Sequence, residues 1–349
     1  MNEQTKKIRE FILNNVSDHP KDISIVTAKR FNITRQAAYR HVAKLVKEGM
    51  LFAEGSTRNR KYGLKPLADL TETLPLENLA EDKVWRDYVR PLLIDLPQNI
   101  LSICEYGFTE MVNNAIDHSE GTKLTISAQR TYQCVEMVVS DNGVGIFNKI
   151  QREFGLDDPL HSLLELSKGK LTTDKKRHSG EGIFFTSRMF DMYTIRSGYI
   201  VFTHLDHRNR KNEEELGESD FLLEHRKNYK EGTSIIMKID TSSEKTAQQV
   251  FDAYTLDDTF GFTRTFVPVF LSAYGEDNLI SRSQAKRLLA RFDVFKEIIL
   301  DFDKVESIGQ AFADEVFRVF RQQNPEINIY PIRTNEQVKK MIRHVTGEK

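Results

Sequence analysis

Four short motifs, which follow one another in fixed order through the middle of the chain, constrain its fold more than any other feature. They occupy residues 110–118, 141–145, 179–182 and 232–233. Each motif is common on its own. The four place acidic, amide and glycine residues where helices and strands are predicted to begin or end. Together they predict a single ligand-binding pocket.

The first motif is predicted to lie on a helix over residues 108–119, where apolar residues recur at core-facing spacing. Glu110, Asn114 and His118 are spaced four residues apart and therefore share one face of that helix. A carboxylate, an amide oxygen and an imidazole on one stripe can hold a hydrated Mg²⁺ and orient a water molecule. The alternative interpretation is an ordinary solvated face.

The second motif follows a partly alternating stretch, residues 133–140, that predicts a strand. Asp141 comes directly after it, where a carboxylate can accept a hydrogen bond from an adenine amino group. Gly143 and Gly145 let the backbone approach a base and sugar without a Cβ clash. The alternative is a common Asp-Asn-Gly turn.

The third motif contains Gly180 and Gly182 and precedes an apolar run with helical spacing. The start of a helix presents free N–H groups and the positive end of its dipole, both of which suit phosphate. The basic residues 175–178 lie just upstream and could close over a triphosphate, although a flexible basic loop is the alternative. The glycine spacing excludes a P-loop, and the absence of a preceding βαβ strand excludes a Rossmann site.

The combined pattern resembles the GHKL, or Bergerat-fold, ATPases over residues 94–240, and within them it is most similar to the anti-sigma-factor serine kinases. The resemblance implies an α/β sandwich that binds ATP and Mg²⁺. In it Glu110 polarises the attacking water or hydroxyl, Asn114 binds Mg²⁺ and Asp141 contacts adenine. The long stretch 146–179 implies an ATP lid unlike that of a minimal kinase, which leaves the role of Lys170 open. The remaining expected nucleotide-binding residues are His118, Gly143, Gly145, Lys175, Arg177, Ser179, Gly180, Gly182 and Thr233.

Residues 1–65 are predicted to form a winged helix-turn-helix, with helices near 5–16, 23–31 and 35–48 and a hairpin over 50–64. This segment contains 14 Lys and Arg and 6 Asp and Glu, a net charge of +8, whereas the rest of the chain carries −9. A basic small domain is typical of nucleic-acid binding. A winged helix used for protein contacts is the alternative. The expected DNA contacts are Arg35, Gln36, Tyr39, Arg40, Arg58 and Arg60.

The C-terminal part, residues 258–349, alternates predicted strands and helices, which indicates a small α/β fold. It resembles the STAS domains of anti-sigma-factor antagonists through residues 301–309, where a strand leads into a helix. In those antagonists the loop carries the phosphorylated serine. Here Ser307 lies one position earlier than the resemblance requires, so it is either a phosphoacceptor or simply the N-cap of the helix. Pro268 indicates that the first strand lies at a sheet edge.

The domain boundaries follow from these segments: winged helix 1–65, linker 66–93, ATPase domain 94–242 and STAS-like domain 258–349. The charged stretch 206–230 is expected to be an inserted hairpin or loop. No run of about 18 apolar residues predicts a membrane span. Two cysteines and a polar N-terminus without a signal-peptide pattern indicate a cytoplasmic protein.

The fold class is therefore a multidomain α+β protein, for which three functions are open. The first is a DNA-binding transcriptional regulator in which ATP binding or slow hydrolysis controls the winged helix. The second is an anti-sigma-type serine/threonine kinase that acts on a STAS domain, with Ser307 as first candidate acceptor. The third is a nucleotide-binding interaction module without turnover. DNA is the expected partner, with a protein partner at the STAS-like domain and a homo-oligomer both left open.

Overall fold

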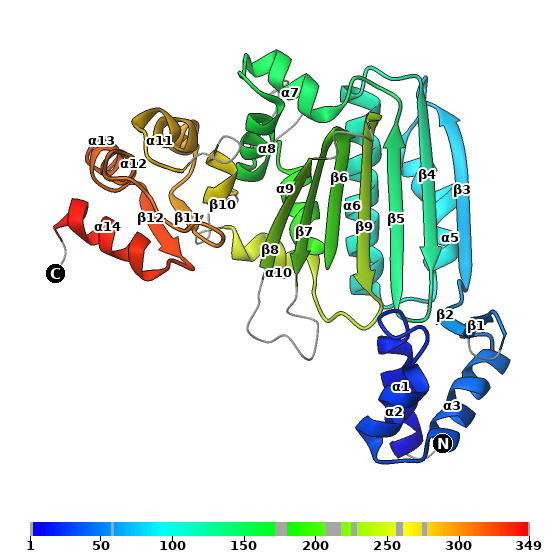
Figure 1. Cartoon of the computed structure of the whole chain (residues 1–349). Coiled ribbons are helices and arrows are strands. Elements are labelled where there is room, and N and C mark those ends of the chain that lie inside the picture. Colours follow the sequence, from blue (N-terminus) through cyan, green and yellow to red (C-terminus); the bar gives the residue numbers. More distant parts are fainter. Residues whose placement is uncertain are drawn as a thin grey trace.

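The computed structural model describes residues 3–56, 59–171, 180–206, 218–224, 229–255, 261–273 and 278–347. A broad antiparallel sheet forms the centre of the molecule. A small helical unit lies beyond one end of its strands, and a second α/β unit lies beside the β8 edge (Figure 1). We call these the N-terminal, central and C-terminal units. The chain is thus a mixed α/β protein of several units.

The N-terminal unit contains three helices followed by a two-stranded hairpin, at the positions predicted from the sequence. Thr34 caps the third helix, because its Oγ1 accepts a hydrogen bond from the Ala37 N–H at 3.2 Å. Nine buried side chains, among them Ile12, Val42 and Leu45, form a core that belongs to this unit alone. Its elements are α1 (Glu3–Asn15), α2 (Ile23–Phe31), α3 (Arg35–Lys47), β1 (Leu51–Glu54) and β2 (Lys61–Leu64).

The central sheet has seven strands in the order β3-β4-β5-β9-β6-β7-β8, and each neighbouring pair is antiparallel. Along β5, residues pointing to the helical side are buried while the intervening residues are half-buried, as expected for a sheet covered on one face. The strands are β3 (Ala68–Pro75), β4 (Lys123–Arg130), β5 (Cys134–Asp141), β6 (Met192–Gly198), β7 (Ile200–Asp206), β8 (Glu218–Glu224) and β9 (Lys230–Asp240).

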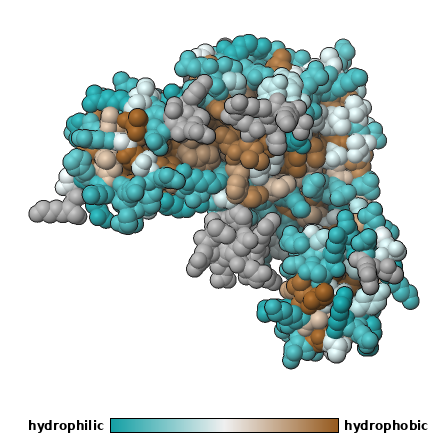
Figure 2. Space-filling model, in the orientation of Figure 1, coloured by the Kyte–Doolittle hydropathy of each residue, from teal (hydrophilic) through white to brown (hydrophobic). Residues whose placement is uncertain are grey.

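Helices cover one face of this sheet, with the long α6 (Gln98–His118) at the centre (Figure 1). On the opposite face, turned to the viewer in Figure 2, apolar side chains gather over the middle strands; Phe221 and Leu223 of β8 are exposed. Among the described residues, no helix combines the length and apolar character needed to cross a membrane. The other helices of this unit are α4 (Glu81–Val84), the π-helical turn η2 (Trp85–Val89), α5 (Arg90–Leu93), α7 (Ile146–Phe154), α8 (Pro159–Lys168), α9 (Gly182–Met189) and α10 (Ala247–Ala253).

The predicted linker over residues 66–93 is wrong, because this segment is part of the central unit. β3 pairs with β4 along its whole length, from Ala68 opposite Arg130 to Pro75 opposite Lys123. The turns that follow bury Trp85 and Val89 against α6. An edge strand keeps many polar residues, so its composition resembles that of a linker. The charged stretch 206–230, which was expected to be an inserted hairpin or loop, likewise contains an edge strand. This strand, β8, lies at the opposite edge of the sheet from β3.

The C-terminal unit is built on a three-stranded parallel sheet in the order β10-β11-β12. Pro268 ends β10 at the sheet edge, as predicted, and the chain turns into a short 3-10 helix at Val269. The strands are β10 (Arg264–Pro268), β11 (Glu297–Asp301) and β12 (Asn328–Ile332). The helices are η3 (Val269–Ser272), α11 (Arg282–Leu289), η4 (Phe292–Val294), α12 (Gln310–Asp314), η5 (Glu315–Val319), α13 (Phe320–Gln323) and α14 (Glu336–Thr346).

Candidate functional site

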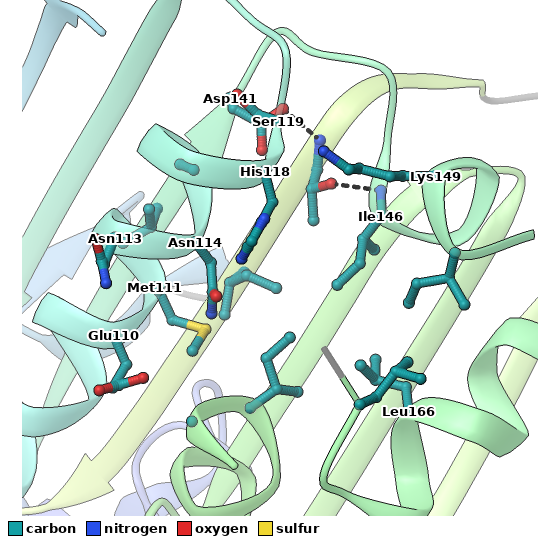
Figure 3. A pocket seen from close by; sticks show the side chains of 18 of the residues that line it. Glu110, Met111, Asn113, Asn114, His118, Ser119, Asp141, Ile146, Lys149 and Leu166 are labelled. Atoms are coloured by element: carbon teal, nitrogen blue, oxygen red, sulfur yellow. Dashed lines mark hydrogen bonds between the residues drawn. The ribbon is translucent and has the colours of Figure 1, made fainter. Parts of the chain in front are cut away.

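A cavity of about 300 Å³ lies between α6, the ends of β5 and β9, and the segment that runs from α7 to α9. A volume of this size is in the range of small-molecule sites. Figure 3 shows the cavity, with side chains from α6 on one side and from α7 and α8 on the other. All four sequence motifs contribute to its wall, through Glu110, Asn114, His118, Asp141, Gly145, Gly180, Gly182 and Thr233.

The helix α6 supplies one wall of the cavity. It begins ten residues earlier than predicted and buries Phe108, Met111 and Val112 against the sheet. This packing turns the stripe of Glu110, Asn114 and His118 towards the cavity, where the three side chains follow one another along the helix (Figure 3). The predicted common face is therefore present in the fold.

Asp141, which was expected to contact adenine, is the last residue of β5 and lines the cavity. Its Oδ1 accepts hydrogen bonds from the backbone N–H groups of Gly143 at 2.8 Å and Thr233 at 3.2 Å. Burial raises the pKa of Asp141 above its ordinary value, and these two hydrogen bonds oppose the rise. The carboxyl group is thus held in one orientation by two motifs far apart in sequence.

Two glycines of the second motif are required by close backbone contacts. A Cβ at Gly143 would lie 1.9 Å from the carbonyl oxygen of Ser119, which is itself bonded to the Val144 N–H at 2.9 Å. Gly145 has a φ of +84°, and a Cβ there would lie 2.6 Å from Ser197 Oγ. The turn after β5 can therefore follow its path only with glycine at both positions.

Glu110 lies at the opposite end of the α6 stripe, against the start of α9. A Cβ on Gly182 would lie 2.0 Å from Glu110 Oε2, so the carboxylate touches the first residue of that helix. Tyr106 lies one turn earlier on α6. Burial raises its pKa, and the negative charges of Glu110 and Glu181 add to this effect. This end of the cavity is acidic and lies beside a helix N-terminus.

The wall opposite α6 comes from residues that the sequence motifs did not identify. Lys149 of α7 lines the cavity and forms ion pairs with Glu120 at 3.4 Å and Glu153 at 3.7 Å. The helical spacing in residues 146–154 is the signal that could have placed a cavity-facing helix here. Apolar side chains complete this wall: Ile146, Ile150, Phe154, Leu166, Leu171 and Ile183.

Several predicted residues lie elsewhere or outside the described residues. Lys175, Arg177, Ser179 and Arg58 belong to the latter group. Lys170 is directed at the C-terminal unit: its Nζ donates to the Val294 carbonyl at 3.3 Å and lies 5.1 Å from the ring centroid of Phe295. Its ammonium group is thus held by that unit.

The Mg²⁺ expected at this site must be compatible with the side chains present. Within the described ranges, no group of three or more His, Cys, Asp or Glu residues is placed to hold a metal ion. Mg²⁺ commonly uses one or two protein oxygens together with water and substrate phosphate. The Asn114 amide oxygen, which lines the cavity, fits that mode, in which a phosphate-bearing ligand and water supply the further oxygens.

The residues expected to contact DNA lie on the N-terminal unit. Arg35, Gln36, Tyr39 and Arg40 are exposed on α3, and Arg60 before β2 donates to the Tyr39 hydroxyl at 3.4 Å. This hydrogen bond joins the exposed face of α3 to the residue that precedes β2. Burial lowers the pKa of His41 on α3, and the cationic groups of Arg9, Lys44 and Arg40 lower it further. The surroundings of α3 are positively charged.

Ser307 is exposed on the loop between β11 and α12. The expectation that it caps the helix is wrong, because α12 begins after Gly309 and Ser307 lies two residues before that cap. The Ile308–Leu279 bridge and the Gly309 N–H bond to the Leu279 carbonyl set this later start.

Comparison with known proteins identifies the C-terminal unit only. Residues 284–339 match the sequence model of the family described as a STAS-like domain of unknown function (DUF4325). The C-terminal unit is therefore STAS-like, as the sequence resemblance predicted. No curated protein matches the chain. A solved structure, described as the crystal structure of an IcIR transcriptional regulator from Alicyclobacillus acidocaldarius, aligns with 72% of this chain and 95% of its own at 13% identity and a TM-score of 0.23. The two folds overlap too little for one to be inferred from the other.

Proposed function

We propose that this protein is a DNA-binding transcriptional regulator in which Mg²⁺-ATP, bound at a GHKL-type site, controls a winged helix-turn-helix. The observation that carries the proposal is the convergence of four separate motifs on one cavity. An accidental match would scatter such short motifs over the surface. Here they supply a buried carboxyl group, a polar helical stripe and glycine-shaped turns to a single cavity.

The cavity suits a nucleoside triphosphate because its two ends differ chemically. Asp141, with its orientation fixed by Gly143 and Thr233, is suited to accept a hydrogen bond from the adenine amino group. Glu110 lies about 12 Å away from His118 along α6, at ~1.5 Å per residue, and beside the start of α9. Phosphates at this end would meet backbone N–H groups and the positive end of a helix dipole.

Hydrolysis would need an oriented water molecule at the phosphate end. Glu110 is the acidic side chain of the stripe and lies next to the start of α9. Its carboxylate would orient that water by accepting a hydrogen bond from it, and would take up the proton as the water attacks. Asn114, one turn away, would hold Mg²⁺, whose role when bound is to neutralise phosphate charge. Leu166, Leu171 and Ile183 would exclude bulk water from this end.

The N-terminal unit supports the DNA-binding part of the proposal. Its three helices and hairpin follow the order of a winged helix-turn-helix, and α3 presents Arg35, Gln36 and Arg40 to solvent. An exposed, basic helix start suits base edges in a major groove, and the hairpin suits phosphate. The local excess of positive charge would attract DNA before any specific contact forms.

The kinase alternative is retained because Ser307 is exposed on a loop of the STAS-like unit. Incubation of the full chain with γ-labelled ATP and Mg²⁺ distinguishes the functions, if both free phosphate and label on the protein are followed. An ATP switch releases phosphate only. Stable label on the protein that is absent from Ser307→Ala would show that the protein is a kinase and contradict the ATP-switch function. Binding without either product would indicate the interaction module.

Two variants test the assigned residues. We expect Glu110→Ala to reduce phosphate release about 100-fold or more while ATP still binds, because general-base contributions are ~10²–10⁴-fold. Asp141→Asn is expected to weaken ATP binding itself. Glu105→Ala, an exposed carboxylate on the same helix, is the matched control. Unchanged turnover in Glu110→Ala would show that its assigned role is wrong.

A further inference from the structure

The C-terminal unit meets the wall of the cavity at a buried, charged junction. Lys168, the last residue of α8, is completely buried, and its Nζ donates to Glu165 Oε1 at 2.6 Å. The same ammonium group donates to the carbonyls of Ala290 at 2.9 Å and Arg287 at 3.2 Å. These carbonyls end α11 of the C-terminal unit, so Lys168 caps that helix at its negative end.

Arg291 completes this junction from the other side. Its guanidinium donates to Glu165 Oε2 at 2.8 Å, to the Gly169 carbonyl at 3.0 Å and to the Lys170 carbonyl at 2.7 Å. Both Arg291 and Lys170 have positive φ, +63° and +51°, a conformation that non-glycine residues rarely adopt. The surrounding contacts hold two strained residues against each other. We call Glu165, Lys168 and Arg291 the clamp.

The clamp belongs to the same short segment that lines the cavity. Leu166 and Leu171 face the cavity, and Leu171 is bonded to Gly180 of the third motif through its N–H, at 3.2 Å. On the other side, Thr265 of β10 donates to the Lys168 carbonyl at 2.7 Å. One face of residues 165–171 therefore forms the cavity wall, and the other is fixed by the C-terminal unit.

A second contact fixes α9, whose first residue touches Glu110. Arg188 near the end of α9 lies 2.6 Å from His204 Nδ1, which lies 2.8 Å from Asp220 on β8. Lys304 and Arg333 of the C-terminal unit bond the backbone carbonyls of β8 at Asp220 and Glu218. The elements before and after the third motif are thus both joined to the C-terminal unit.

We propose that the C-terminal STAS-like unit is a built-in regulator of the nucleotide site, which acts by holding residues 165–171 in the position that completes the cavity. The inference rests on the proposed function. Nucleotide affinity then depends on the clamp, and a ligand or partner that shifts the C-terminal unit changes that affinity. The coupling is reciprocal: nucleotide that closes on Leu166 and Leu171 stabilises the clamp.

The first test measures binding of a non-hydrolysable ATP analogue with Mg²⁺ to the full chain by calorimetry. Arg291→Gln and Glu165→Gln are each expected to raise the Kd roughly tenfold, within the range of about 5- to 150-fold typical of coupled sites. Arg318→Gln is the matched control, since it removes a guanidinium–carboxylate pair, with Asp314, that lies within the C-terminal unit. Its Kd is expected to stay within about twofold of the wild-type value.

The second test needs no variant and follows hydrogen exchange of the wild-type chain. Saturation with the analogue is expected to slow exchange of the amides of residues 287–294, which do not line the cavity. Arg291→Gln should lose this slowing if it folds. Unchanged exchange in the wild type would overturn the inference.

The outcomes separate this inference from the proposed function. A wild-type chain that binds no ATP analogue contradicts the proposed function, and the inference fails with it. A wild-type chain that binds, with folded clamp variants of unchanged Kd, contradicts the inference alone. Variants with a lower melting temperature but wild-type Kd would likewise show that the clamp is structural support only.

Discussion

The N-terminal and C-terminal units are attached to the central sheet in opposite ways. The N-terminal unit encloses its own core, built around Ile12, Val42 and Leu45. Within the described part of the chain, the C-terminal unit shares one core with the central unit, to which its buried residues, such as Phe262 and Val267, belong. We call the N-terminal unit tethered, because its core is its own, and the C-terminal unit fused, because it shares a core with the central unit.

This difference indicates which part can move when the proposed site binds nucleotide. A unit with its own core can change orientation without exposing apolar surface, so rotation of the N-terminal unit is energetically accessible. A shared core resists such rotation, because each displacement opens a packed interior. In the proposed switch the N-terminal unit is therefore the part that can reorient, whereas the C-terminal unit acts through small displacements at the clamp.

The largest expected effect comes from removing each unit in turn. A chain ending at residue 255 lacks the C-terminal residues that cover Phe184 and Phe185 in the shared core. These two apolar side chains would become exposed, and we expect the shortened chain to aggregate or unfold. A chain starting at residue 65 keeps the shared core and should stay folded. Soluble yield and circular dichroism measure both. A folded chain without the C-terminal unit would contradict the shared core.

Single core substitutions should reproduce this contrast within the intact chain. The ring of Phe262 lies 4.5 Å from that of Phe184 and 5.3 Å from that of Phe295, measured between centroids. Phe262→Ala is expected to cost about 3–5 kcal/mol of unfolding free energy and to weaken ATP binding. Leu45→Ala should cost about 2–5 kcal/mol in the N-terminal unit but change ATP affinity much less than Phe262→Ala does. Equal effects on ATP affinity would remove the distinction.

How far each region could be predicted from the sequence follows from the range of its interactions. The stripe of Glu110, Asn114 and His118 depends on local helical spacing, which a sequence displays directly. The same is true of Thr34, which caps α3. Strand β3 was missed, because pairing at a sheet edge needs only a partner strand and leaves polar residues in place.

The clamp could not be predicted from the sequence. Glu165 and Arg291 meet only because two units pack together, and neither residue lies in a motif. Lysine on a helix is most often exposed, so the burial of Lys168 has no signal in its immediate surroundings. The cavity wall that contains Leu166 was also missed, because its position depends on the packing of the two units.

A smaller effect is expected for the DNA-binding surface. Arg35→Ala combined with Arg40→Ala should weaken DNA binding by about 1–3 kcal/mol for each arginine that reaches a base, and should reduce the salt dependence of binding. ATP affinity should not change, because both side chains belong to the tethered unit. Titrations at several salt concentrations measure both quantities. Arg86→Ala, exposed in the central unit, is the control. Unchanged DNA binding would mean that α3 binds protein instead.

The smallest expected effect, taken over one pH unit, tests the junction between the central and C-terminal units. Burial lowers the pKa of Lys168 to about 8, although the facing Glu165 carboxylate opposes this and Arg291 reinforces it. An unfolded chain would keep this proton to about pH 10.4. Between these values the unfolded state binds more protons than the folded state, so stability from this residue rises with pH, by at most ~1.4 kcal/mol per pH unit. Below pH 8 both states are protonated and the contribution is constant.

The measurement compares wild type with Lys168→Met, in which this titration is absent. The difference in unfolding free energy, wild type minus variant, should be constant from pH 6 to 7 and then increase in favour of the wild type up to about pH 10. Titrating groups remote from Lys168 are common to both chains and cancel, and the Glu165 carboxylate that Lys168 contacts titrates in the acid range. A difference that stays flat to pH 10 would mean that the ammonium group is hydrated in solution. The junction between the central and C-terminal units would then be open to water, and the contrast with the tethered N-terminal unit would disappear.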